Sequence, residues 1–234
     1  MTIIVTIETI VGSLFDVYRE VVPGTFFHSD QLTNERRTHP NEQERTQLQS
    51  RYFYTADGII YSLQKGVPTL SITREEDNLV LRHLNDEVNN PYSQLITRKN
   101  YYPDSTETQQ AISAAQTVTI DLTKLRFFQR SWDVCCLAVP TTMYDELNAE
   151  ERKLAERVYG QGKDFIANMN MLNENNVKWA AIYVLNPDYV REIAQSGPIA
   201  RACWLNNIYN NAGFIAYDNC VNALNHLRGN RFSE

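Results

Sequence analysis

Two adjacent cysteines, Cys135 and Cys136, are the residues of this chain best suited to nucleophilic chemistry. A thiol nucleophile needs a base, which would be a distant histidine such as His83 or His226, oriented by an Asp or Asn. The cysteines lie in the apolar run 132–140, which is typical of a buried strand. Because burial raises the pKa of a thiol, we expect these cysteines to be packed and unreactive. A thiol-dependent enzyme is therefore the least favoured function.

Metal and phosphate chemistry lack a local motif. The four histidines are His28, His39, His83 and His226, and none belongs to H-E-x-x-H or to a His/Cys cluster at zinc spacing. The segment 160–163 (Gly-Gln-Gly-Lys) resembles part of a phosphate loop, but Asp164 stands where Ser or Thr is needed, so it predicts a helix end and a turn. We expect no catalytic residue, no metal and no required cofactor.

The composition excludes several classes of partner. A formal net charge of −6 is unsuited to neutralising nucleic-acid phosphates. No run reaches the roughly 18 apolar residues that cross a bilayer. The apolar N-terminus has no basic start and carries acidic residues, so it does not resemble a secretory leader. Four cysteines without a C-x-x-C pair are typical of reduced thiols in a cytosolic protein.

The polar residues predict a surface rich in contacts. The chain has 22 Asn and 13 Tyr, and its 16 Arg outnumber its 6 Lys. Arg suits planar, bidentate contacts, and Lys is depleted at interfaces. The composition therefore favours protein association over catalysis.

We expect two parts in the chain: an N-terminal arm at 1–22 and a single core domain at 23–234. Apolar residues recur in the arm at spacings of three and four, which predicts an amphipathic helix. These residues are Ile3, Ile7, Ile10, Leu14 and Val17. Such a helix either docks on its own core or packs on a neighbouring subunit, and we consider its residues candidates for contacts between subunits.

In the first half of the core domain, a polar segment precedes a series of predicted strands. Residues 28–49 predict a loop or a solvated helix. Two β-rich runs within 51–63 flank Asp57-Gly58, a strong signal for a hairpin turn, and 67–73 predicts a third strand. We expect a helix at 75–88 and a strand at 92–102.

The second half alternates strands and helices without regular βαβ order. Residues 117–128 predict a half-buried strand with an irregularity, and 132–139 a buried strand. Asn148 and Glu151 resemble a capping box that opens a helix through Val158, and a strand is expected at 177–185. Asn186-Pro187 begins another helix, and 213–228 predicts a C-terminal amphipathic helix. This mixture favours an α+β fold with an antiparallel β-sandwich core flanked by helices.

Four segments, in order, resemble those of the cypovirus polyhedrins, which form the crystalline matrix of insect-virus occlusion bodies. They are Phe27 to Gln31, Tyr52 to Tyr54 with Asp57-Gly58 and Lys65, Tyr101 to Asp104 followed by Val118 to Ile120, and Asn211 followed by Cys220, Ala223 and Leu224. The resemblance implies a β-sandwich whose N-terminal helix reaches other subunits. It also implies trimers that pack into a crystal in the host-cell cytoplasm and embed virions, with nucleotides as possible ligands between subunits.

Such a crystal must dissolve in alkali, and this chain has groups that titrate there. Cys, Tyr and Lys lose protons near pKa values of about 8.5, 10 and 10.4, while Arg stays cationic. Ionised tyrosines repel one another and no longer donate hydrogen bonds. The candidates for this switch, in the segments of the resemblance, are Tyr52, Tyr54, Tyr101 and Tyr102. The alternative function is a soluble interaction or adaptor module that forms no crystal.

Overall fold

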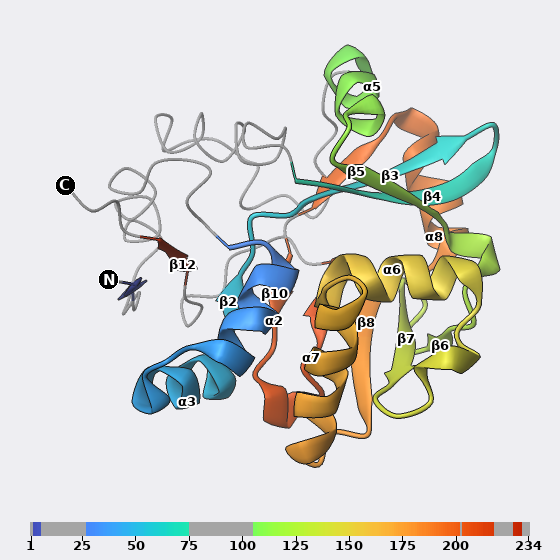
Figure 1. Ribbon diagram of the computed structural model, residues 1–234. Helices are drawn as coiled ribbons and strands as arrows, with labels where there is room; N and C mark the ends of the chain where they lie inside the picture. The colour runs from blue at the N-terminus through green and yellow to red at the C-terminus, as the bar shows by residue number, and fades with distance from the viewer. Residues whose placement is uncertain (1, 6–26, 75–104, 202, 218–226, 231–234) are drawn as a thin grey trace.

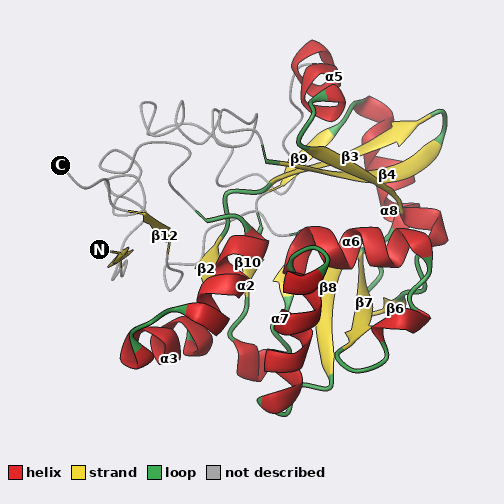
Figure 2. Ribbon diagram, in the orientation of Figure 1, coloured by secondary structure: helices red, strands yellow, loops and turns green. Residues whose placement is uncertain are grey.

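The computed structural model describes residues 2–5, 27–74, 105–201, 203–217 and 227–230. In these ranges the chain forms a six-stranded sheet, a four-stranded sheet and a two-stranded ribbon, with helices packed around them (Figure 1 and Figure 2). Most strand pairs are antiparallel. The predicted α+β class is confirmed.

The six-stranded sheet runs through the lower half of the molecule in Figure 1. Its order is β2 (Phe53–Tyr54), β10 (Trp204–Leu205), β11 (Phe214–Ile215), β8 (Trp179–Leu185), β7 (Val134–Pro140) and β6 (Phe128–Gln129). The β11–β8 pair is parallel. The terminal strands β2 and β6 have two residues each, so one edge of the long strand β7 is only partly covered.

The four-stranded sheet lies above it and is antiparallel throughout. Its order is β5 (Thr117–Asp121), β4 (Val67–Thr73), β3 (Gly58–Gln64) and β9 (Ile199–Arg201). The ribbon pairs β1 (Thr2–Val5) with β12 (Leu227–Asn230).

Four helices cover one face of the six-stranded sheet (Figure 2): α2 (Ser29–Thr38), α3 (Glu42–Ser50), α6 (Ala149–Tyr159) and α7 (Lys163–Glu174). Helix α5 (Ser105–Ser113) packs near β5, and α8 (Pro187–Ile193) packs near β3 and β4. Short 3-10 helices occupy Leu122–Lys124, Tyr144–Glu146, Ala194–Ser196 and Ile208–Asn210. None of the helices in the described ranges is long and apolar enough to span a bilayer.

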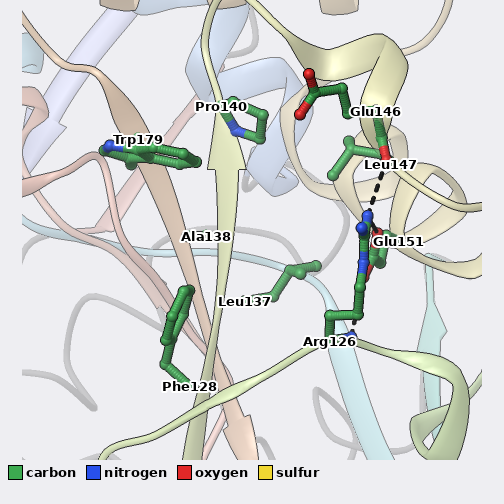
Figure 3. A pocket seen from close by; sticks show the side chains of 9 residues that line it. All are labelled: Arg126, Phe128, Leu137, Ala138, Pro140, Glu146, Leu147, Glu151 and Trp179. Carbon is green, nitrogen blue, oxygen red and sulfur yellow. Dashed lines mark hydrogen bonds and ion pairs between the residues drawn. The ribbon is translucent and has the colours of Figure 1, made fainter.

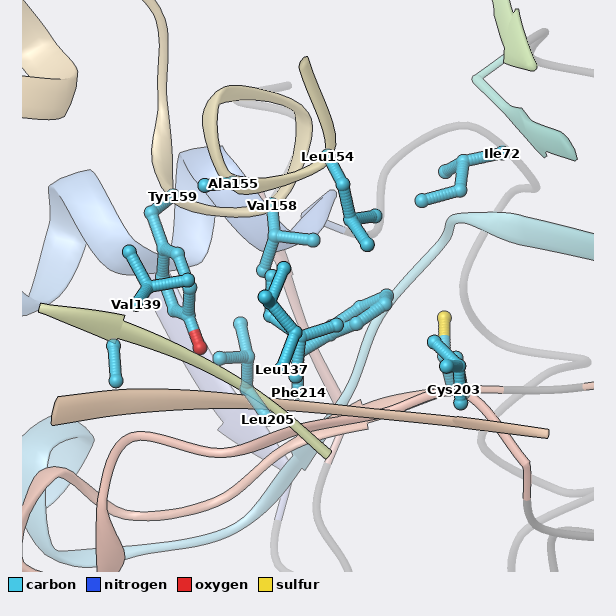
Figure 4. Packing of buried hydrophobic residues seen from close by; sticks show 14 of the residues in the cluster. Ile72, Leu137, Val139, Leu154, Ala155, Val158, Tyr159, Cys203, Leu205 and Phe214 are labelled. Atoms are coloured by element: carbon cyan, nitrogen blue, oxygen red, sulfur yellow. The ribbon is translucent and has the colours of Figure 1, made fainter. Parts of the chain in front are cut away.

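A continuous apolar core joins the helices to the sheet. Figure 4 shows Val158 and Tyr159 of α6 facing Leu137 and Val139 of β7, with Phe214 of β11 beside them, and all five are buried. The hydroxyl of Tyr159 lies 2.8 Å from the carbonyl oxygen of Ala181 and 3.0 Å from that of Ala212. The buried hydroxyl of Tyr159 is therefore hydrogen-bonded to the backbone, as burial of a polar group requires.

Several elements with local signals in the sequence are confirmed. The side chain of Asn148 accepts the backbone N–H groups of Glu150 and Glu151, and the side chain of Glu151 accepts that of Asn148, which completes the capping box of α6. Strands β4, β5, β7 and β8 occupy predicted ranges, and α8 begins at Pro187 after Asn186 as expected. Gly160 ends α6 with a φ of 108°, in the left-handed region that favours glycine.

The predicted hairpin at Asp57-Gly58 is wrong. Strands β2 and β3 belong to different sheets, and β3 instead pairs with β4 through a two-residue turn. That turn is Lys65-Gly66, with φ values of 52° and 82°. Positive φ at both central residues is the geometry of a type I′ turn, whose twist matches that of paired strands.

The terminal helices are corrected where the structure describes them. Residues 2–5 form β1 instead of the start of a helix, and the rest of the predicted arm lies outside the described residues. At the C-terminus, Phe214–Ile215 and Leu227–Asn230 are strands, and 218–226 lie outside the described residues. The helix expected at 75–88 and the strand at 92–102 lie outside them as well.

The polar segment 28–49 forms two helices with buried contacts. Leu32 and Leu48 are fully buried, and so is Arg36. The guanidinium of Arg36 donates from Nε to the carbonyl of Leu48 (2.9 Å) and from Nη2 to that of Arg51 (3.0 Å). Arg36 thus satisfies carbonyl groups at the end of α3, which a helix leaves without an internal partner.

Candidate functional site

Strand β7 has an open stretch of edge beside Ala138. On this side β7 pairs with β6 only at Cys135 and Cys136. The N–H groups of Arg130 and Ser131 donate to the carbonyl of Val134, so alternate residues from Val134 onward direct their backbone groups toward β6. By this alternation the N–H and C=O groups of Ala138 point toward the open edge.

The residue that would pair with Ala138 is turned away from it. Continuing the β6–β7 register places Arg126 opposite Ala138, but the backbone N–H of Arg126 donates to Oε1 of Glu151 (2.9 Å). Pro140, two residues further along β7, has no N–H group, as is usual for proline on an edge strand. The open edge is therefore short.

Two large aromatic side chains flank this edge and are exposed to solvent. Phe128 pairs with Cys136, and Trp179 pairs with Pro140, so both side chains lie on the same face of the sheet as Ala138. Phe128 is 68% exposed and Trp179 is 51% exposed. Figure 3 shows them on one side of β7, with Arg126, Glu146 and Glu151 on the other.

An ion pair between Arg126 and Glu151 forms the polar side of this site. Arg126 donates from Nε to Oε1 of Glu151 (2.8 Å) and from Nη2 to Oε2 (2.5 Å), and Nη2 also donates to the carbonyl of Glu146 (2.8 Å). The Glu151 side chain is 1% exposed and that of Arg126 is 67% exposed. Burial alone would raise the pKa of the Glu151 carboxyl, but hydrogen bonds from Arg126 and from the Asn148 backbone outweigh it and lower that pKa. Glu151 is thus a fixed carboxylate that holds Arg126 in place.

Together these groups enclose a pocket of about 230 Å³, which we call the β7-edge pocket. Its lining residues are Arg126, Phe128, Leu137, Ala138, Pro140, Glu146, Leu147, Glu151 and Trp179. Pockets for drug-sized ligands span roughly 300–1,000 Å³, so this one has room for a single large side chain or a small molecule.

A second, polar cavity of about 360 Å³ lies over a buried ion cluster. It is lined by His28, Asp30, Gln31, Asn34, Arg74, Gln116, Arg157, Gly160, Gln161 and Asp164. Beneath it, Arg74 donates from Nε to Asp57 (2.9 Å) and from Nη1 to Asp30 (2.6 Å), and the Ser29 N–H donates to Asp57 (2.8 Å). These charges pair with one another and join α2 to β3 and β4, so the cluster has a structural role.

The electrostatics of Asp57 fit that role. Burial would raise the pKa of its carboxyl, but Arg74 and, to a smaller extent, His28 lower it to about 2. The pKa of His28 is itself lowered by burial, and its Nδ1 lies 3.8 Å from Asp57. Asp57 is therefore a carboxylate over the whole neutral range.

The thiols are packed in the fold. Cys135 and Cys203 are buried and Cys136 is half-buried. Burial raises the pKa of both Cys135 and Cys136, which lowers their reactivity, as expected for this strand. The candidate bases His83 and His226 lie outside the described residues. Within the described ranges, no three His, Cys, Asp or Glu side chains converge as metal ligands.

The candidate switch and contact residues are only partly described. The half-buried ring of Tyr52 packs against that of Trp204, with centroids 5.6 Å apart, at the β2 end of the six-stranded sheet. Tyr54 lies in β2, and Tyr101 and Tyr102 lie outside the described residues. Ile3 is in β1, opposite Gly229, and Ile7, Ile10, Leu14 and Val17 lie outside them. The β7-edge pocket is at the other end of that sheet.

The sequence singled out Glu151 only as part of a helix cap, and the other polar and aromatic members of the pocket were missed. Phe128 and Trp179 were placed at the ends of predicted strands, where an aromatic residue usually packs in the core. Both side chains lie on the face of the sheet opposite the one that Leu137 and Val139 present to α6, and the choice of face depends on strand register. The only available signal was the pair Phe127-Phe128, since adjacent strand residues face opposite sides.

Comparisons with known proteins bear on the fold. No protein-family model and no curated protein matches the chain. A solved structure matches over 97% of this chain and 96% of its own, with a TM-score of 0.60 and 14% identity. It is described as "Accommodation of massive sequence variation in Nanoarchaeota by the C-type lectin fold". At this identity the likeness concerns the fold alone, so the chain is similar to the C-type lectin fold.

Proposed function

We propose that this protein is a non-enzymatic recognition module that binds an extended segment of another protein at the β7-edge pocket. The observation that carries the proposal is the exposure of Phe128 and Trp179 on one face of the sheet, beside an open strand edge. Large aromatic side chains dominate the binding energy of protein interfaces, where a partner removes them from water.

The shape and polarity of the pocket favour a polypeptide. The N–H and C=O groups of Ala138 offer main-chain hydrogen bonds to an added strand, which is a common mode of peptide recognition. Since Pro140 has no N–H group, the pairing is limited to a short stretch. Affinity must therefore come from the side chain that enters the pocket.

The pocket is built on well-anchored elements. The capping box of α6 fixes Glu151, and Glu151 in turn fixes Arg126. Positioning a binding group through a second layer of contacts lowers the entropy lost on binding. The solved neighbour is described as a C-type lectin fold that accommodates massive sequence variation, which by analogy suits a scaffold whose surface residues specify the partner.

Selection from a random peptide library tests this function. We expect peptides that bind the wild type and lose about tenfold or more in affinity for Trp179→Ser. Tyr209→Ser is the matched control, because Tyr209 is 62% exposed but lies in the 3-10 helix Ile208–Asn210, outside the pocket. If every selected peptide binds Trp179→Ser as well as the wild type, the proposal is wrong.

The crystalline matrix predicted from the polyhedrin resemblance is a second candidate. The observation that favours it is the placing of aromatic residues at both ends of one sheet: Tyr52 with Trp204 near β2, and Phe128 with Trp179 beside β7. A contact between two different surfaces of identical subunits can propagate through an assembly.

Expression of the chain alone in insect cells separates the two candidates. The matrix requires intracellular crystals that dissolve as the pH rises toward the tyrosine range near about 10. It also requires Tyr52→Phe to move the pH of dissolution. A freely soluble small oligomer would rule out the matrix and leave the recognition module.

A further inference from the structure

We propose that the β7-edge pocket selects a cationic side chain, above all arginine, presented by an extended peptide segment. This inference rests on the binding function proposed above and names the chemistry of its ligand. It is carried by the charges of the pocket, its two aromatic rings and the open backbone of Ala138.

The pocket carries one unbalanced negative charge. Of its three ionisable residues, Arg126 and Glu151 form an ion pair, which leaves Glu146. Glu146 is exposed, and its carboxylate forms no ion pair with the residues that the structure describes. Figure 3 shows this carboxylate near Pro140, at the end of the pocket opposite Phe128. Glu146 lines the same pocket as both rings, on the other side of β7, so a cationic group bound in the pocket offsets its net negative charge.

The aromatic rings favour the same ligand. A guanidinium within about 6 Å of a Trp or Phe ring is attracted by the negative face of the ring, and Trp gives the strongest attraction. The same face of the sheet already holds such a contact, because the guanidinium of Arg130 lies 4.7 Å from the centre of the Tyr183 ring. Phe128 and Trp179 have no comparable partner among the described residues, which leaves their faces available.

The backbone sets where the cation would lie. A peptide residue paired directly with Ala138 points its side chain to the same face as Ala138. That face also carries Phe128 and Trp179, and the small side chain of Ala138 leaves the space between them open. A long side chain at the paired position therefore lies on the face of the two rings, in the pocket that Glu146 also lines.

Other occupants fit the charges less well. An acidic segment would meet Glu146 and a chain with a net charge of −6. A second copy of this chain carries that same net charge, which disfavours close approach at low salt. A basic segment is attracted both by Glu146 and by the net negative charge of the chain.

Three peptides that differ at one position test the inference. Each is acetylated and amidated, alternates valine and threonine, and has arginine, citrulline or glutamate at its centre. Citrulline keeps the length and planar end group of arginine, but a carbonyl oxygen replaces one nitrogen, so the side chain is uncharged and has fewer N–H donors. We expect the arginine peptide to bind the wild type about tenfold more tightly than the citrulline peptide. Added salt should reduce this difference, because it screens the attraction.

Matched variants assign the effect to the pocket. Glu146→Gln should lower the preference for arginine over citrulline severalfold and leave citrulline binding unchanged. Glu42→Gln removes the same charge from the first turn of α3, far from the pocket, and should keep the preference. Trp179→Ser should weaken all peptides that bind.

The outcomes separate this inference from the function on which it rests. Equal binding of arginine and citrulline, or tighter binding of glutamate, would overturn the inference. The binding function would stand if those peptides, or others from the random library, still depended on Trp179. If no peptide depends on Trp179, both are wrong.

Discussion

Among single residues, Asp57 shows most clearly how one buried charge joins distant parts of the chain. Its carboxylate accepts hydrogen bonds from Arg74 in the segment after β4 and from the first N–H of α2. Burying the charge of Asp57 without an oppositely charged partner would be costly. Removing one member of such a pair leaves the charge of the other uncompensated. The stability of the contact between α2 and the four-stranded sheet therefore depends on Asp57 being ionised.

We expect Asp57→Asn to lower the free energy of unfolding by about 3 kcal/mol near neutral pH. The wild type should also lose stability in acid, by roughly 2 kcal/mol from this group. Its pKa is about 2 in the folded chain and 3.8 in the reference state, so the contribution is complete above the higher value and is lost as the pH falls through the lower one.

Urea unfolding at several pH values measures both effects. Asp145→Asn is the control, because Asp145 pairs with Arg152 at the surface, where such pairs contribute little. Equal stability of Asp57→Asn and Asp145→Asn would contradict the role given to Asp57.

The buried hydroxyl of Tyr61 lets us predict how the stability of the fold changes in alkali. It is fully buried, its hydroxyl donates to the carbonyl of Ala216 (2.9 Å) and accepts the N–H of Leu185 (3.2 Å), and burial raises its pKa above the usual value of 10.0. Stability is therefore complete below that value and falls as the pH rises beyond it, because only the unfolded chain gives up the proton readily.

A spectroscopic titration of tyrosinate should show exposed tyrosines ionising while the fold persists, and buried ones only as it unfolds. Tyr61→Phe should remove part of the late phase and lower stability near neutral pH by roughly 1–3 kcal/mol, because it leaves buried backbone groups unpaired. A late phase that is unchanged in Tyr61→Phe would show that this phenol titrates normally.

Among the helices and strands, α6 contributes both to the stability of the fold and to the β7-edge pocket. Asn148→Ala removes the acceptor for the N–H groups of Glu150 and Glu151, and we expect a loss of about 1 kcal/mol in the free energy of unfolding. Peptide binding should weaken as well, because Glu151 holds Arg126. Thr142→Ala, at an exposed position, serves as the control in both measurements and should change neither.

Elements with short-range signals could be predicted from the sequence, and those with long-range causes could not. The caps Asn148 and Asn186 act within one helical turn, so their helices begin where expected. The signal at Asp57-Gly58 was misread because the carboxylate of Asp57 is engaged by Arg74, and the hairpin turn falls at Lys65-Gly66 instead. The buried contacts of Arg36 likewise depend on residues of another helix.

In the whole molecule, the α+β class followed from the order of strands and helices, but the candidate site did not. The pocket exists because β6 stops short of Ala138 and Arg126 turns toward Glu151. Both facts depend on how distant segments pair, which no spacing in the sequence encodes. The resemblance directed attention to Tyr52 and its neighbours, at the opposite end of the same sheet.

The most direct test of binding at the β7-edge pocket is to follow the indole N–H signals of the protein by NMR during titration with the arginine peptide. The chain has three tryptophans, so the signal of Trp179 can be assigned by its loss in Trp179→Phe. We predict that the Trp179 signal shifts progressively to saturation, while those of Trp132 and Trp204 stay in place. Binding that moves either of the other two signals and leaves Trp179 unchanged would contradict the account.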